Sequence, residues 1–244
     1  MGRVLFIADA HLTPGDERTF KIFNRFVTEL LNEDAGQLFI MGDFFDFWFE
    51  YKNFIMSSYF SVLESLRRLT NTGWKVNFIV GNHDFTVGDT LQKITGMKIY
   101  TQYDLRHNNK LYRLEHGDLQ MGNDFTYHLW CFVMRRKITM CFWSLLPPLV
   151  VDWMIALIIK LSRGVTKRGK LRERTLYDVM KNYECLNGYD GIICGHLHDY
   201  QDFIKKIDGC DKRFSVIPAW YVDAPEYAEL LDNDSLIVHN LMEK

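Results

Sequence analysis

Short apolar runs alternate with amphipathic stretches along the first third of the chain. Residues 4–8, 37–41 and 75–80 are rich in Val, Ile and Phe, and each run ends beside a Gly or an Asp, which is typical of buried strands. Between these runs, residues 17–32 and about 56–71 carry apolar side chains at helical spacing. The order strand, helix, strand, helix, strand predicts a largely parallel sheet with helices outside it.

Further strands are predicted in the second half of the chain. Gly191–Cys194 is a fourth buried apolar run, and about 111–115, 214–218 and 235–241 are additional candidates. These strands would extend the first sheet or face it as a β-sandwich. The length of 244 residues suits one catalytic domain with an insertion. We therefore expect a single α/β domain that spans residues 1–244.

Residues 138–161 interrupt this pattern because they are almost wholly apolar. Pro147 and Pro148 in the middle would remove backbone hydrogen bonds from a single membrane-spanning helix, so two short helices with a proline corner are favoured. Such a hairpin suits contact with an anionic lipid surface or an amphiphilic substrate, and the alternative is a core hairpin with a solvated basic edge. The basic flanking residues are Arg135, Arg136, Lys137, Arg163, Lys167, Arg168, Lys170, Arg172 and Arg174.

Composition and charge limit which partners and which cellular compartment are expected for the protein. Lys and Arg total 29 against 31 Asp and Glu, so the net charge of −2 gives no general case for a nucleic-acid partner. The five cysteines are odd in number and form no Cys-x-x-Cys pair, which argues against a disulfide framework or a zinc ribbon and favours a reducing cytosol. The apolar run at the N-terminus is too short for the core of a signal peptide. We expect a cytoplasmic protein.

Residues that can bind metals follow the apolar runs. In chain order the motifs are Asp-x-His at 9–11, Gly-Asp-x-x-Asp at 42–46, Gly-Asn-His-Asp at 81–84, His-Gly-Asp at 116–118 and Gly-His-x-His at 195–198. A single Asp-x-His pair is more often a cap or a surface pair, but five such motifs in this order are specific. Because the carboxyl ends of strands in an α/β sheet form the ligand crevice, we expect the five loops to converge.

The residue types suit a pair of divalent ions. Mixed carboxylate, imidazole and amide ligands favour Mn²⁺, Fe or Zn²⁺, whereas Mg²⁺ and Ca²⁺ sites use oxygen almost exclusively. Asp43 is the natural bridging ligand, because each carboxylate oxygen can bind one ion. Two ions about 3.5–4 Å apart can activate a water and neutralise the phosphate oxygens that it attacks. Glycines beside the ligands would let the backbone approach the ions closely.

The order of the five motifs resembles that of the calcineurin-like metallophosphoesterases, and the resemblance runs from Asp9 to His198. It extends to one branch, the UDP-2,3-diacylglucosamine pyrophosphohydrolases of lipid A synthesis. The similar features are LFIADAHL, MGDFFDFW, GNHDF, HGDLQMGNDFTYH, the apolar and basic insertion, and Ala219-Trp220. The resemblance implies a β-sandwich with αββα layers and a helical insertion or lid at about 125–175. It also implies hydrolysis of a nucleotide-linked glycolipid to UMP and lipid X by a peripheral protein on the inner face of the cytoplasmic membrane.

The resemblance also implies roles for individual residues. One ion, most simply Mn²⁺, would be held by Asp9, His11, Asp43 and His198, and a second by Asp43, Asn82, His116 and His196. Asp43 and Asn82 would also serve catalysis, with His83 beside the metals to steady charge or protonate the leaving oxygen. Asp84 would orient His83 or cap the next helix. Candidate substrate contacts are Asp124, Tyr127, Arg163, Lys167 and Lys170.

Two departures from this branch concern the substrate and leave the chemistry intact. The branch in its best-known form has Arg where His83 stands, and Thr-His-Arg-Pro where this chain has Leu-His-Asp-Tyr at 197–200. Three alternatives therefore stand beside the lipid substrate. They are a related enzyme for another nucleotide diphospho-lipid, dinucleotide or phosphodiester, a non-catalytic scaffold on the same fold, and a membrane-docking module. No obligate protein partner is expected.

Overall fold

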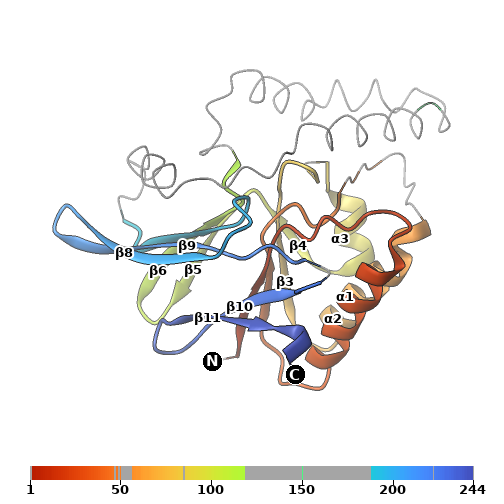
Figure 1. The fold of residues 1–244 in the computed structure, drawn as a ribbon, viewed down its shortest axis with the longest axis horizontal. Coiled ribbons are helices and arrows are strands. Elements are labelled where there is room, and N and C mark those ends of the chain that lie inside the picture. The colour runs from red at the N-terminus through yellow and green to blue at the C-terminus, as the bar shows by residue number, and fades with distance from the viewer. Residues whose placement is uncertain are drawn as a thin grey trace.

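The structure is a computed structural model that describes residues 2–46, 48, 50, 57–84, 86–118, 150, 188–221 and 223–243. Two β-sheets face each other, and helices cover the outside of the first sheet (Figure 1). The first sheet has six strands in the order β11 (Leu236–Asn240), β10 (Glu226–Leu230), β1 (Val4–Ile7), β2 (Gln37–Ile40), β3 (Lys75–Ile79) and β4 (Lys98–Tyr100). β1 to β4 pair in parallel, whereas β10 runs antiparallel to both of its neighbours.

The second sheet has five strands. Their order is β5 (Gln102–His107), β6 (Lys110–Glu115), β7 (Gly191–Cys194), β9 (Cys210–Val216) and β8 (Gln201–Ile207). β6, β7 and β9 are parallel, and the outer strands β5 and β8 are antiparallel to their neighbours. Both sheets therefore have a parallel centre, which places the carboxyl ends of several strands at a common edge.

Among the described residues, three α-helices lie on the first sheet: α1 (Glu17–Leu30), α2 (Phe60–Asn71) and α3 (Asp89–Thr95). The 3-10 helices η1 (Ser57–Tyr59) and η3 (Leu241–Glu243) are also observed. α1 begins where it does because the Asp16 side chain accepts a hydrogen bond from the backbone N–H of Thr19 at 3.2 Å. Its apolar stripe then packs Phe23 and Phe26 into the core.

The central strands of the first sheet are buried on both faces and separate two core clusters. In β1, Leu5 and Ile7 pack among the helices, while Val4 and Phe6 pack against the second sheet. Phe6 stacks on Phe39 of β2 with ring centroids 5.4 Å apart. Burial of each such side chain contributes about 1.5–3 kcal/mol, which explains why these strands are uninterrupted apolar runs.

The predicted α/β sandwich is confirmed, and most predicted elements agree with the structure to within a few residues. Gly191–Cys194 is observed with the bounds predicted. The second helix begins later than predicted, because the turn before it is the 3-10 helix η1, and β9 begins four residues before the predicted 214. The sequence patterns missed β4, β5, β8, β10 and α3, which are short or have charged residues that interrupt the apolar pattern.

Some expectations fall on residues that the structure does not describe. These are the apolar hairpin at 138–161 and the insertion at about 125–175, of which the structure describes only Val150, so both stay predictions. In the described ranges the helices lie on one side of the sandwich, so the second outer helical layer also stays a prediction. Within those same ranges, no helix combines the length and the apolar character that a membrane span requires.

Candidate metal centre

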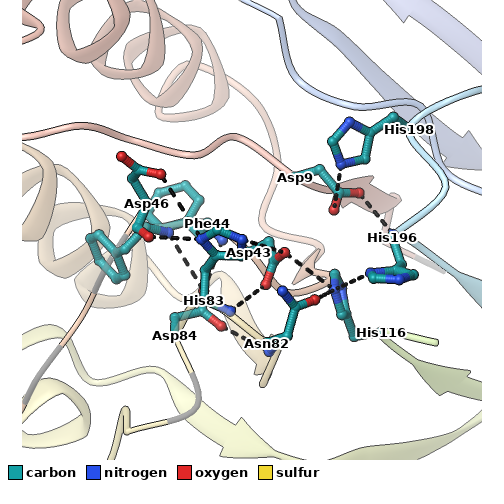
Figure 2. A network of polar contacts seen from close by, with 12 residues as sticks. Asp9, Asp43, Phe44, Asp46, Asn82, His83, Asp84, His116, His196 and His198 are labelled. Carbon is teal, nitrogen blue, oxygen red and sulfur yellow. Dashed lines mark hydrogen bonds and ion pairs between the residues drawn. The ribbon is translucent and has the colours of Figure 1, made fainter. Parts of the chain in front are cut away.

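The five motif loops meet at one edge of the sandwich because the parallel strands are paired in matching register. Ile7 of β1 lies opposite Ile40 of β2, which lies opposite Phe78 of β3, so these three strands end at nearly the same level. In the second sheet, Glu115 of β6 lies opposite Cys194 of β7. The loops that follow these strands carry Asp9, His11, Asp43, Asp46, Asn82, His83, Asp84, His116, His196 and His198, most of which Figure 2 shows converging.

Five of the candidate ligands have a left-handed backbone conformation with positive φ. Nine non-glycine residues have positive φ within the described part of the chain, and the four that are not candidate ligands are Asn or Asp. Left-handed conformations of this kind cost on the order of 1 kcal/mol or more, and they persist where the surrounding structure determines them. The five candidate ligands are Asp9, His11, Asp43, His196 and His198, with φ of 50°, 43°, 49°, 68° and 67°.

Asp9, His11 and His198 form a first cluster in which one ligand atom from each lies within 4.8 Å of the others. Asp9 Oδ2 accepts a hydrogen bond from the backbone N–H of His196 at 2.9 Å, and Asp9 Oδ1 lies 3.6 Å from Nε2 of His198. Asp9 Oδ1 is buried and has no hydrogen-bond partner among the described residues. A buried carboxylate oxygen without a donor beside two imidazoles fits a bound cation.

Asp43, His116 and His196 form a second cluster with the same spacing. His116 Nε2 lies 3.5 Å from Asp43 Oδ2, 3.2 Å from His196 Nδ1 and 3.1 Å from Asn82 Oδ1. The other nitrogen of His116, Nδ1, is 2.8 Å from the Met41 carbonyl and donates to it, so Nε2 is the nitrogen that faces the cluster. Two imidazole nitrogens, an amide oxygen and a carboxylate oxygen thus converge, which is the donor set of a cation site.

Burial sets the charge of these groups. It lowers the pKa of His11 and of His196 to about 4, so both imidazoles are neutral near pH 7, as metal ligands must be. Burial also raises the pKa of the Asp9 carboxyl to about 7. Burial opposes the charge of Asp43 as well, but the adjacent His116 outweighs it and holds the pKa of Asp43 well below its ordinary value. Burial lowers the pKa of His116 too, but Asp43 and then Asp9 outweigh burial and raise it well above its ordinary value, so His116 is protonated in the metal-free centre and a metal ion would displace that proton.

Two glycines leave room for the ligands. A Cβ at Gly42 would lie 2.5 Å from His116 Nδ1, and a Cβ at Gly81 would lie 2.3 Å from Asp43 Oδ1. Gly42 also has a φ of +90°, which favours glycine. The expectation that glycines allow close approach at the site therefore has a structural basis.

His83 lies between Asp43 and Asp46. Its backbone N–H donates to Asp43 Oδ1 at 2.8 Å, and its ring Nδ1 lies 2.9 Å from the carbonyl oxygen of Asp46. Nδ1 therefore carries a proton, and Nε2, 4.0 Å from Asp43 Oδ2, faces the clusters. Burial lowers the pKa of His83, but Asp43 and then Asp46 outweigh burial and raise it above the ordinary value. The sequence motif contained Asp46, yet its link to His83 was not predicted.

Asp84 neither orients the ring of His83 nor caps the following helix, so both expectations for it were wrong. The carboxylate is fully buried and accepts the backbone N–H groups of Phe44 and Gly81, each at 2.8 Å. α3 has Gly88 at its N-cap, and its first N–H groups donate to Glu50. Asp84 therefore ties the loop after β3 to the loop after β2.

The structure brings together all seven residues predicted as metal ligands, together with His83. The candidate substrate contacts are not placed. Asp124, Tyr127, Arg163, Lys167 and Lys170 lie outside the described residues.

The sandwich fold and the paired clusters together define a metallophosphoesterase. The family model for calcineurin-like phosphoesterases matches residues 2–200, and the chain belongs to this family. It is therefore a metal-dependent hydrolase that uses divalent metal ions.

Particular relatives are similar over nearly their whole length. The UDP-2,3-diacylglucosamine hydrolase of Proteus mirabilis is 28% identical over 239 residues, which cover 96% of this chain and 97% of that protein. The UDP-2,3-diacylglucosamine hydrolase of Neisseria meningitidis serogroup B is 26% identical over 236 residues, which cover 94% of this chain and 93% of that protein.

Proposed function

We propose that this protein hydrolyses the pyrophosphate of UDP-2,3-diacylglucosamine to UMP and lipid X, 2,3-diacylglucosamine 1-phosphate, in lipid A biosynthesis. The observation that carries the proposal is the pair of adjacent ligand clusters at the common edge of both sheets. The names of relatives that match the chain over more than nine-tenths of its length support the lipid substrate.

Seven side chains would hold two ions. Asp9, His11 and His198 would hold one ion and Asn82, His116 and His196 the other, and we assign Asp43 as a shared ligand of both. When bound, such ions act as Lewis acids on phosphoryl oxygens and lower the pKa of a water. Mn²⁺ suits the mixture of nitrogen and oxygen ligands, and Fe or Zn²⁺ are alternatives with the same preference.

The chain's own residues orient the substrate and move a proton. Water attacks one phosphorus of the anhydride in line with the bridging oxygen, so one P–O bond forms and one breaks without a covalent enzyme intermediate. The amide of Asn82 contacts the phosphoryl group from the loop after β3. His83 presents Nε2 to the reacting group because its Nδ1–H is held by the Asp46 carbonyl. Its raised pKa favours the imidazolium, which can donate a proton to the leaving oxygen or steady its charge.

We also propose that the protein is cytoplasmic and acts as a peripheral protein at the inner face of the cytoplasmic membrane. Support comes from residues 138–161, whose apolar composition and basic flanks suit acyl chains and anionic headgroups. Sedimentation with anionic liposomes tests this idea, with a variant that lacks residues 138–161 as the comparison. Equal sedimentation of both proteins would contradict it.

The substrate proposal is tested by incubation with UDP-2,3-diacylglucosamine and Mn²⁺, followed by chromatographic detection of UMP and lipid X. A panel of dinucleotides, other nucleotide diphospho-lipids and simple phosphodiesters serves as the comparison. Cleavage of a panel compound without release of UMP from the glycolipid would favour a related enzyme with another substrate. A non-catalytic scaffold would cleave none of them.

A further inference from the structure

Tyr221 lies beside the metal centre in the segment that follows β9. Backbone hydrogen bonds hold this segment between the two sheets: Ala219 N donates to the His198 carbonyl at 3.0 Å, and Trp220 N donates to the Ala8 carbonyl at 2.9 Å. Ala8 directly precedes Asp9 in the chain. The position of Tyr221 is therefore tied to the two loops that carry Asp9 and His198.

The phenol oxygen of Tyr221 lies 3.3 Å from Nδ1 of His198. On the other side of the same ring, Nε2 lies 3.6 Å from Asp9 Oδ1, and Figure 2 shows the ring turned toward Asp9. An imidazole that binds a metal ion through one nitrogen carries its N–H on the other nitrogen. A hydrogen bond at Nδ1 decides which nitrogen carries that proton, and so leaves the lone pair of Nε2 for a metal ion.

Two other histidines of the centre show the same arrangement with a different partner. Nδ1 of His116 faces the Met41 carbonyl at 2.8 Å, and Nδ1 of His83 faces the Asp46 carbonyl at 2.9 Å. These acceptors are main-chain groups, whose positions the fold sets. For His198 the group at Nδ1 is a side-chain hydroxyl, which a substitution can remove.

We propose that Tyr221 is a positioning residue of the metal centre: its phenol oxygen accepts the Nδ1–H of His198 and holds Nε2 toward Asp9. The proposal rests on the two-ion centre described under the proposed function. Loss of such an outer hydrogen bond lowers metal affinity by about 10–100-fold. Because Tyr221 is 39% exposed and the His198 side chain is 31% exposed, water competes for this bond and we expect the lower end, about 10-fold.

The loss should be confined to one of the two sites. His198 belongs to the cluster with Asp9 and His11, whereas the second cluster contains Asp43, His116 and His196. Tyr221→Phe removes one oxygen atom and leaves the ring in place. A matched control is Tyr200→Phe, since Tyr200 is also 39% exposed, lies two residues after His198, and donates its hydroxyl to the Leu236 carbonyl at 3.1 Å.

The experiment is calorimetric titration of the metal-free full chain with Mn²⁺ alone, followed by turnover of UDP-2,3-diacylglucosamine at rising Mn²⁺ concentration. Tyr221→Phe is expected to weaken one of two binding events by about 10-fold and to recover its turnover at saturating Mn²⁺. Tyr200→Phe is expected to bind both ions as the wild type does.

Three results would overturn the proposal. The first is unchanged Mn²⁺ affinity in Tyr221→Phe. The second is a turnover defect that persists at saturating Mn²⁺ with unchanged metal affinity, which would assign the hydroxyl to the substrate. The third is an equal loss of affinity in Tyr200→Phe, which would indicate a general effect of removing a hydroxyl. A wild-type protein that binds no Mn²⁺ would instead refute the two-ion centre itself.

Discussion

A methyl group at Gly81 is expected to disable the metal centre while the protein stays folded. A Cβ at this position would lie 2.3 Å from Asp43 Oδ1 and 2.4 Å from the backbone nitrogen of Asp43. Neither loop can move away easily, because Asp43 Oδ1 accepts the N–H of His83 at 2.8 Å and Gly81 N donates to Asp84 at 2.8 Å. The added carbon therefore displaces the carboxylate that we assign to both ions.

The size of the effect follows from this geometry. Overpacking a buried site costs about 1–3 kcal/mol. The unfolding entropy is about 2.1 cal/mol/K per residue, so the free energy of unfolding of a 244-residue chain changes by about 0.5 kcal/mol per degree near the melting temperature. The melting temperature should therefore fall by about 2–6 °C. A shift of about 1 Å in a catalytic group costs about 100-fold in rate. Activity should thus fall far more than stability.

Elemental analysis for bound metal, kcat with Mn²⁺ and thermal denaturation together test Gly81→Ala. Gly209→Ala is the control, because a Cβ at Gly209 would meet no atom within 4 Å. Its φ of +80° means that alanine there costs only the strain of a left-handed backbone, about 1–2 kcal/mol. The control should lose stability and keep metal and turnover. Wild-type metal content and turnover in Gly81→Ala would refute the reasoning.

Three further predictions follow from the site and the fold. Asp43→Ala should lose bound metal and nearly all turnover, whereas His83→Ala should keep metal and lose about 10²–10⁴-fold in kcat. A metal-loaded Asp43→Ala enzyme with wild-type kcat would contradict the role of Asp43. A fully active His83→Ala enzyme would contradict the role of His83. Chelation of metal held at about 100 times its Kd should remove about 2.7 kcal/mol of stability, or about 5 °C in melting temperature, and an unchanged melting curve would argue against bound metal. Arg3 Nε donates a hydrogen bond to Glu229 Oε1 at 2.7 Å, which holds the pKa of Glu229 below its ordinary value of 4.5. The stabilisation of the fold by this pair is therefore complete above pH 4.5 and is lost as the pH falls through the lowered pKa. Urea unfolding should show Glu229→Gln less stable than wild type by about 1–2 kcal/mol at pH 7, with a smaller difference in acid, and a difference that does not shrink would oppose this account.

Most central strands were predictable because their signal is local. β1, β2, β3 and β7 are apolar runs that end at Gly or Asp, and the structure shows each of them buried over most of its length. β8 and β10 were missed for the opposite reason. Charged residues interrupt their apolar pattern, and β10 becomes a strand by pairing with β1, which lies more than two hundred residues away in the chain.

The convergence of the candidate metal ligands was also predictable, since ligand types and glycines recur in recognisable motifs. Their partners were not. Asp46 supports His83 through its backbone carbonyl, Asp84 joins two loops, and Tyr221, which lies outside the five metal-binding motifs, lies beside His198. Such contacts depend on distances between segments that are remote in sequence.

By itself, the sequence determined which side chains can bind metals and that each group follows a strand, because side-chain chemistry and apolar runs are properties of neighbouring residues. The tertiary structure decided that these groups form adjacent clusters, the two assigned to metal ions and a third of His11, Asp46 and His83. The physical reason is that matching strand register in both sheets brings the five loops to one edge. Positive φ angles occur at five of the candidate ligands, namely Asp9, His11, Asp43, His196 and His198. Burial and hydrogen bonds hold these residues in that backbone conformation.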